Sequence, residues 1–153
     1  MRKYKRILVA TDFSAVSEIG VREAVELASH YGAELIFLHV VEHFPEHLPH
    51  YRIAHEDMDP EQFILDRARK DLDALCDRLG ITDGVREVKL TTHSAKAEIV
   101  SFATEQKVGL IVIGSRGRNS LIDILSGSTA TGVVRAAPCD VFVMHEQEAS
   151  DEA

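Results

Sequence analysis

The sequence predicts an α/β fold, a single domain built on an open parallel sheet of five strands with helices on both faces. Three observations support this prediction. Short apolar runs rich in β-branched residues alternate with longer segments of helical periodicity. Most of these runs are nearly continuously apolar, which is typical of strands that are covered on both faces. The length of 153 residues suits one domain with a substantial core.

The strand predictions rest on runs of Val, Ile, Leu and Phe that are too short for helices. One run alternates polar and apolar residues, so residues 85–92 are expected nearer an edge of the sheet. The predicted strands are residues 6–11, 34–42, 85–92, 108–115 and 139–145.

The helix predictions rest on apolar spacing and on end signals. Asp12 or Ser14 is a candidate cap for the first helix, and Gly32 is expected to end it. Pro60 suits the first position of the second helix, and Ser94 is a candidate cap for the third. The predicted helices are residues 12–32, 60–80, 94–107 and 127–137.

Charge and cysteine content limit the kinds of function that this sequence favours. The net charge of −8 argues against nucleic-acid binding through broad electrostatics. No apolar run approaches the ~20 residues that a membrane helix needs, and no signal peptide is apparent. Cys76 and Cys139 have no metal or redox spacing, and both are expected to be buried, reduced thiols of a cytoplasmic protein. The expected domain spans residues 1–146, and residues 147–153 form an acidic flexible tail.

The segment GSRGRNSLIDILSGST places glycines where a phosphate cradle needs them. Gly114 ends a predicted strand, where the missing Cβ lets a ligand approach the backbone. Gly127 precedes Ser128 and Thr129 at a predicted helix start, whose free N–H groups favour phosphate. Glycines also occupy such positions for turn geometry alone, and that alternative is open for each one.

This segment fits the pattern G-x2-G-x9-G-[ST] at Gly114, Gly117, Gly127 and Ser128, and it resembles the ATP-binding signature of the universal stress protein family. The stretches RILVATDFS, LHVVE, GLIVIGSRGR and APCDVFVMH also match the family pattern in order, so the resemblance covers nearly the whole chain. It implies the ATP-binding branch of the family. It also implies a Rossmann-like domain, similar to the adenine nucleotide alpha hydrolases, with strand order 3-2-1-4-5.

The resemblance implies contacts to ATP with Mg²⁺, and no metal site made by the protein alone. Asp12, whose carboxylate can accept from both ribose hydroxyls, would lie at the adenine and ribose end with Ala10 and Val40. Ile113 and Gly114 would pack against the sugar and base. Some relatives have a hydroxyl residue at the position of Ala130, so here the contact would be made by the backbone alone, without a side-chain oxygen for the phosphate or metal. The residues implied to hold the phosphates are Arg116, Gly117, Gly127, Ser128, Thr129 and Ala130.

The sequence indicates binding without efficient turnover. It offers no assigned general base and no catalytic triad, and His39 is expected to be a satisfied core histidine. No catalytic residue is therefore predicted, and ATP occupancy is expected to act as a regulatory signal in a stress response. Two alternatives stay open. The chain is an interaction protein with a vestigial nucleotide site, or it hydrolyses ATP slowly or phosphorylates itself.

Residues 43–59 carry His43, His47, His50 and His55 among several carboxylates. The spacing matches no defined metal motif, so a polar, mobile surface loop is favoured over a zinc or nickel site. A lid over the nucleotide, or a response to pH, are further alternatives.

By the resemblance, the last strand lies at an edge and pairs antiparallel with a second copy around Val141 and Val143, giving a homodimer. The other partner considered is an unknown client protein that docks on the surface of the chain.

Overall fold

A computed structural model of the chain describes residues 3–43, 59–115 and 128–146. Arg116, Gly117 and Gly127, which are predicted to contact the phosphates, lie outside these residues, as does the predicted tail at 147–153. Within the described ranges the elements are β1 (Arg6–Ala10), α1 (Ala15–Tyr31), β2 (Glu34–Glu42), α2 (Pro60–Arg78), β3 (Val85–Thr91), α3 (Ala95–Glu105), β4 (Leu110–Gly114), α4 (Ser128–Ala136) and β5 (Asp140–Met144).

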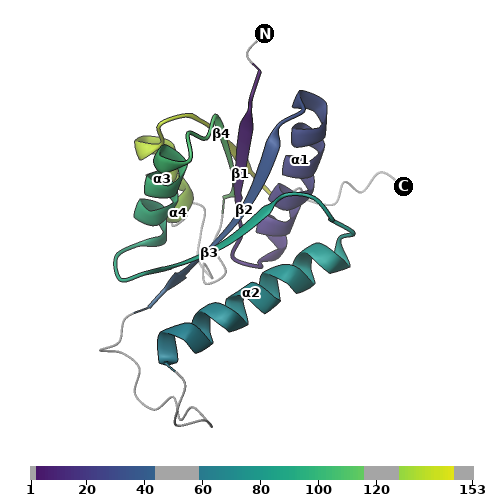
Figure 1. The fold of residues 1–153 in the computed structure, drawn as a ribbon. Coiled ribbons are helices and arrows are strands. Elements are labelled where there is room, and N and C mark those ends of the chain that lie inside the picture. The colour runs from purple at the N-terminus through teal and green to yellow at the C-terminus, as the bar shows by residue number, and fades with distance from the viewer. Residues whose placement is uncertain (1–2, 44–58, 116–127, 147–153) are drawn as a thin grey trace.

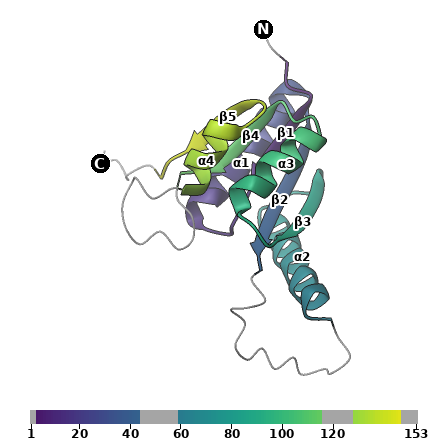
Figure 2. The same cartoon turned by 90° about the vertical axis from the view of Figure 1, so that its left-hand side faces the viewer.

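The strands form one parallel sheet in the order β3-β2-β1-β4-β5, which confirms the predicted fold class and strand order; Figure 1 labels the first four strands and Figure 2 all five. β1 lies at the centre, with Leu8 paired to Ile36 of β2 and to Ile111 of β4. The two edges are β3 and β5, so the prediction of an edge position for residues 85–92 is also confirmed.

The helices cover the two faces of the sheet separately. α1 and α2 pack on one face, over a core that includes Val21, Phe37 and Leu72. α3 and α4 pack on the other face, over a core that includes Phe102 and Val133. Figure 2 shows α3 and α4 in front of the sheet and α1 behind it. The chain thus crosses from one face to the other between the first two and the last two helices.

The helix ends follow the sequence signals, with one choice decided by the structure. Ser14, and not Asp12, caps α1, because its side chain accepts from the backbone N–H of Ser17. Gly32 ends α1 in the left-handed region with φ of 62°. Pro60 occupies the first turn of α2, and Ser94 caps α3 as predicted.

The two cysteines differ in burial. Cys76 of α2 is fully buried, as expected, but Cys139 is only half-buried, so the expectation of two buried thiols is wrong for Cys139. Cys139 precedes the edge strand β5, where the sheet has a neighbour on one side only. Desolvation raises the pKa of both thiols above the ordinary value.

None of the helices in the described part of the chain is long and apolar enough to cross a membrane.

Candidate functional site

The sheet has a crossover point at its centre. β1 and β4 are neighbours, yet β1 leads into α1 on one face while β4 leads towards α4 on the other. Ligands of open parallel sheets bind outside the carboxyl ends of the strands at such a point. The candidate site therefore lies beyond Ala10 and Gly114, the last residues of β1 and β4.

The loop between β1 and α1 is held by its own polar side chains. Asp12 Oδ1 accepts from the backbone N–H of Ser14 at 3.0 Å. The Thr11 hydroxyl accepts from the N–H of Phe13 at 3.1 Å. These short-range hydrogen bonds make the loop a turn in which the Asp12 carboxylate is fixed to the backbone.

Two buried hydroxyls anchor this loop to α1. The side-chain oxygens of Thr11 and Ser17 lie 3.1 Å apart, and the Ser17 hydroxyl donates to the Ser14 carbonyl at 2.9 Å. Buried hydroxyls are costly unless they are hydrogen-bonded, so this pair constrains where α1 begins.

The apolar residues predicted to contact the nucleotide lie together. Ala10, Ile113 and Ala130 are buried members of the core under α3 and α4, and Val40 packs against that core while staying half-exposed. The structure thus brings residues from β1, β2, β4 and α4 to one end of the sheet. Of these four side chains, Val40 is the one with substantial surface open to a ligand.

Gly114 has a packing role that sequence reasoning missed. A Cβ at this position would lie 3.0 Å from Val16 Cγ1 and 3.2 Å from the backbone nitrogen of Ser17. The absent side chain therefore lets the first turn of α1 approach the end of β4. The glycine is visible in the sequence, but the residues that it lies against belong to α1, so the sequence alone did not reveal the contact.

The start of α4 lies at the same end of the sheet as Gly114. Because β4 and β5 are parallel, α4 must return along the sheet, and its first residue Ser128 is at the carboxyl end of β4. Thr129 is half-buried in the first turn. The N–H groups of this turn supply the positive end of the helix dipole near the crossover point.

His39 of β2 contacts the same loop. Its Nδ1 lies 2.7 Å from the Thr11 carbonyl oxygen, and its ring centroid lies 4.4 Å from that of Phe13. The expectation that His39 has a hydrogen-bond partner is confirmed, but the residue is half-buried and not enclosed in the core. Its link to the Asp12 loop has no signal in the sequence, because the two segments are separated by α1.

The histidine-rich segment is described only at its first residue. His43 is buried and its N–H donates to the Thr91 carbonyl at 2.9 Å, so a surface-loop position is wrong for this residue. The extension of the β2–β3 ladder past Glu42 explains the burial. His47, His50 and His55 lie outside the described residues. Among the residues that are described, no group of three or more His, Cys, Asp or Glu is arranged to hold a metal ion.

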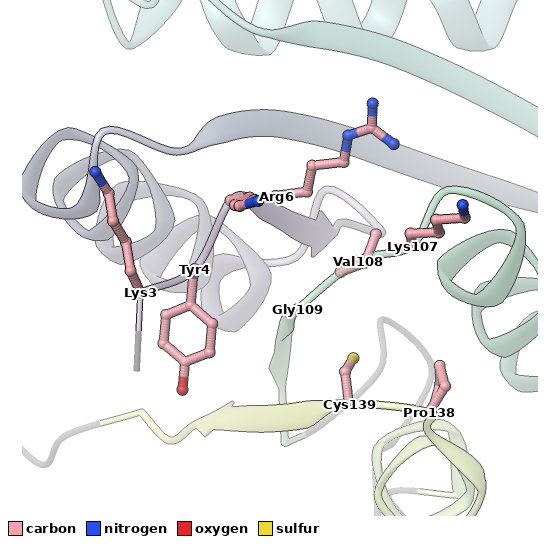
Figure 3. Close-up of a pocket in the computed structure, with 9 residues that line it drawn as sticks. Lys3, Tyr4, Arg6, Lys107, Val108, Gly109, Pro138 and Cys139 are labelled. Carbon is pink, nitrogen blue, oxygen red and sulfur yellow. The ribbon is translucent and has the colours of Figure 1, made fainter. Parts of the chain in front are cut away.

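A hollow of about 340 Å³ lies at the opposite end of the sheet, lined by Lys3, Arg6, Lys107 and Cys139 among others. Arg6 is engaged there, because its guanidinium donates to the Gln106 carbonyl at 2.7 Å and pairs with Glu34. Figure 3 shows the ammonium groups of Lys3 and Lys107 pointing away from Cys139. These cations do not converge on one point, so the hollow lacks the geometry of a phosphate site.

An ion pair lies beside the candidate site. Glu18, in the first turn of α1, accepts from both terminal nitrogens of Arg78, the shorter contact being 2.8 Å. The Arg78 hydrogen bond holds the pKa of Glu18 below its ordinary value. The pair ties the start of α1 to the end of α2.

Comparison with known proteins shows the family. The sequence pattern of the universal stress protein family matches residues 3–145. Universal stress protein A homolog 2 of Coxiella burnetii is 34% identical over 145 residues, which cover 94% of this chain and 97% of the relative. The chain therefore belongs to the universal stress protein family.

Solved structures share the fold. A universal stress protein in complex with cAMP has a TM-score of 0.68 at 22% identity, covering 95% of this chain and 100% of that one. A universal stress protein from Archaeoglobus fulgidus in complex with dAMP has a TM-score of 0.63 at 23% identity, covering 94% of this chain and 99% of that one. At sequence identities this low, the structural similarity shows that the proteins share a fold.

Proposed function

We propose that this chain is a nucleotide-binding universal stress protein, which holds an adenine nucleotide at the crossover point between β1 and β4. The observation that carries the proposal is that the ordered Asp12 loop and the start of α4 both lie at the carboxyl end of the sheet. The complexes of two fold relatives with cAMP and dAMP support an adenine nucleotide as the ligand.

The residues suit the parts of such a ligand. Val40 offers a half-exposed apolar surface for the base, at the end formed with Ala10, Ile113 and Gly114. The Asp12 carboxylate suits the ribose hydroxyls. The first turn of α4, with Ser128, Thr129 and Ala130, suits a phosphate group. Arg116, Gly117 and Gly127 complete the phosphate contacts in this proposal.

The same residues are compatible with ATP and Mg²⁺. The ion prefers oxygen ligands, and in this proposal the Asp12 carboxylate and the hydroxyl groups of Ser128 and Thr129 would supply them. Bound Mg²⁺ would neutralise charge on the phosphates. Asp12 would orient the ion, and the α4 amides would hold the phosphate oxygens.

The proposed role is regulatory binding without efficient turnover. The Asp12 Oδ1 atom is engaged by the Ser14 amide, which favours a positioning role over that of a general base. Occupancy would then act as a signal in a stress response. Turnover of ATP on the order of 1 s⁻¹ or faster in purified protein would contradict this part of the proposal.

Thermal unfolding with and without ATP and Mg²⁺ tests the binding. A ligand that binds only the folded state adds about 2.7 kcal/mol of stability at 100 times its Kd, so the midpoint should rise. Asp12→Asn keeps an oxygen for the Ser14 amide but removes the charge, so the folded loop should persist while the ligand-induced rise shrinks. Asp83→Asn, in an exposed turn, is the matched control and should respond as wild type does.

Repeating the unfolding experiment with AMP and with cAMP shows which phosphate groups the site needs for binding. A rise with AMP equal to that with ATP would assign an adenine monophosphate as the ligand. No rise with any of the three at millimolar concentration would contradict the nucleotide site and favour the alternative, an interaction protein with a vestigial site.

A homodimer through β5 is the second part of the proposal. β5 is an edge strand, and Phe142 leaves 46% of its surface exposed. Val141 and Val143 point to the opposite face and pack against the core under α3 and α4. An apolar edge strand of this kind favours antiparallel pairing with a second copy.

Sedimentation velocity tests the dimer. Phe142→Lys should shift the protein towards monomer, because it places charge on the proposed interface without touching the core. Val134→Lys is the control, since Val134 of α4 is 52% exposed and lies off the edge strand. Wild-type protein that is monomeric at micromolar concentration would contradict the dimer.

A further inference from the structure

We propose that His39 is a positioning residue of the nucleotide site, whose ring holds the loop that carries Asp12 and thereby sets the affinity for the nucleotide. The inference rests on the proposed function of this site. It assigns a role to a side chain on β2 that makes its contacts with the loop after β1.

The first contact is a hydrogen bond of fixed direction. His39 Nδ1 lies 2.7 Å from the Thr11 carbonyl oxygen, at the short end of the usual range. A carbonyl oxygen only accepts, so Nδ1 carries the proton and donates it. The bond joins residues 28 positions apart and ties β2 to the first residue after β1.

The second contact is with a strained residue. The His39 ring packs against the Phe13 ring with centroids 4.4 Å apart and planes tilted by 40°. Phe13 has φ of 64°, the left-handed region, which is unfavourable for a residue with a Cβ. Such a conformation persists only where the surroundings hold it. The His39 ring and the Thr11 hydroxyl, which accepts from the Phe13 N–H, are two of the groups that do so, beside the core against which Phe13 packs.

Asp12 lies between the two residues that His39 contacts. Fixing the Thr11 carbonyl and the Phe13 ring leaves the Asp12 backbone little freedom, and the Ser14 amide then holds its side chain. A site that is ordered before the ligand arrives loses less entropy on binding. His39 should therefore increase nucleotide affinity without touching the nucleotide.

Two amide substitutions separate this role from general packing. The amide nitrogen of His39→Asn can take the place of Nδ1, while that of His39→Gln reaches the place of Nε2. His39→Phe keeps a ring but has no donor. Calorimetry with ATP and Mg²⁺ should give His39→Asn, which keeps the donor but loses the ring, an affinity between those of wild type and His39→Gln. His39→Gln and His39→Phe should bind roughly tenfold more weakly than wild type, the scale of one hydrogen bond.

Amide hydrogen exchange, measured without nucleotide, tests independently of binding whether His39 orders the loop. In His39→Gln and His39→Phe, the amides of Phe13 and Ser14 should exchange faster, while that of Val112 in β4 should keep its wild-type rate. His39→Asn should protect both loop amides. Urea unfolding of each variant identifies any loss of global stability.

The outcomes separate the two proposals. Equal affinity and equal loop protection in His39→Asn, His39→Gln and wild type would overturn the role of His39. A wild type that binds no adenine nucleotide would overturn the nucleotide site and the effect of His39 on affinity, while the exchange rates would still decide whether His39 holds the loop.

Discussion

The two ends of the sheet are stabilised in different ways. At the carboxyl end, the side-chain hydrogen bonds within the Asp12 loop are local, as between Ser14 and the amide of Ser17, or Thr11 and the amide of Phe13, and His39 adds one bond from β2. At the amino end they join distant parts of the chain. The Tyr4 hydroxyl donates to Asp140 at 2.9 Å across 136 positions, and Arg6 reaches the Gln106 carbonyl across 100.

The difference indicates separate tasks. Local hydrogen bonds order a loop at small entropic cost, which suits a loop that must present a carboxylate to a ligand. Long-range contacts hold together the segments that begin β1 and β5, and they therefore contribute to the stability of the fold. Substitutions in the Asp12 loop or against it should alter both stability and nucleotide affinity, whereas those at the amino end should alter stability alone.

The largest effect is expected for Gly114→Ala at the carboxyl end. The new Cβ would press on Val16 and on the backbone of Ser17, so the free energy of unfolding should fall by about 1–3 kcal/mol, the usual range for overpacking. Urea denaturation measures this change, and the nucleotide Kd should rise with it because the start of α1 must move.

Gly20→Ala is the matched control for Gly114. Its Cβ would meet Val112 Cγ1 at 3.6 Å and Met144 Cγ at 3.7 Å, which are ordinary contacts. Alanine also favours a helix interior over glycine by roughly 0.5–1 kcal/mol, so Gly20→Ala should be neutral or stabilising. Equal losses in both variants would show that close packing at Gly114 is not the cause.

The next effect compares two helix caps. Ser14→Ala and Ser94→Ala each remove a side-chain acceptor from a helix start, and each should cost about 1 kcal/mol of stability. Ser14 also belongs to the Asp12 loop, so Ser14→Ala alone should weaken nucleotide binding in calorimetry. A loss of affinity of the same size in Ser94→Ala would contradict the proposal that the Asp12 loop, and not the start of α3, contributes to nucleotide binding.

Tyr4→Phe tests the amino end. It removes the hydrogen bond to Asp140 but keeps the edge contact with the Tyr31 ring, whose centroid lies 5.0 Å away. Stability should fall by about 0.5–1 kcal/mol, the lower part of the range for a partly buried hydrogen bond. The nucleotide Kd should not change, and a Kd raised severalfold would contradict the separation of the two ends.

The smallest effect is a pH dependence at Glu18. Arg78 lowers the pKa of Glu18 in the folded protein below the ordinary value of 4.5, so the charged carboxylate adds stability above that value. This stability is lost as the pH falls through the lowered pKa. Thermal unfolding should show wild type slightly more stable than Glu18→Gln at pH 7, with the difference gone in strong acid.

An exposed ion pair contributes little, which is why Glu18 comes last. Glu23→Gln, at another glutamate of α1, is the comparison for the loss of charge alone. A difference between wild type and Glu18→Gln that grows in acid would have the wrong sign for a lowered pKa.

The helices and strands of this protein could be predicted from its sequence. Apolar runs predicted the strands, helical spacing predicted the helices, and the Gly32, Pro60 and Ser94 signals marked their ends, because each depends on neighbouring residues. The strand order came from the resemblance to the universal stress protein family and is confirmed. Ala10 and Ile113, which the resemblance implied as nucleotide contacts, belong to one buried cluster, and their contact with a nucleotide stays a prediction.

The tertiary structure decided the features that need two distant segments. Ser14 took the cap of α1 while Asp12 formed a turn with the Ser14 amide, although both residues qualified from sequence. The contact of Gly114 with α1 and that of His39 with Thr11 join elements that periodicity cannot relate. The exposure of Cys139 followed from the missing neighbour of β5. Local patterns set which elements form, and packing in three dimensions sets which side chains meet.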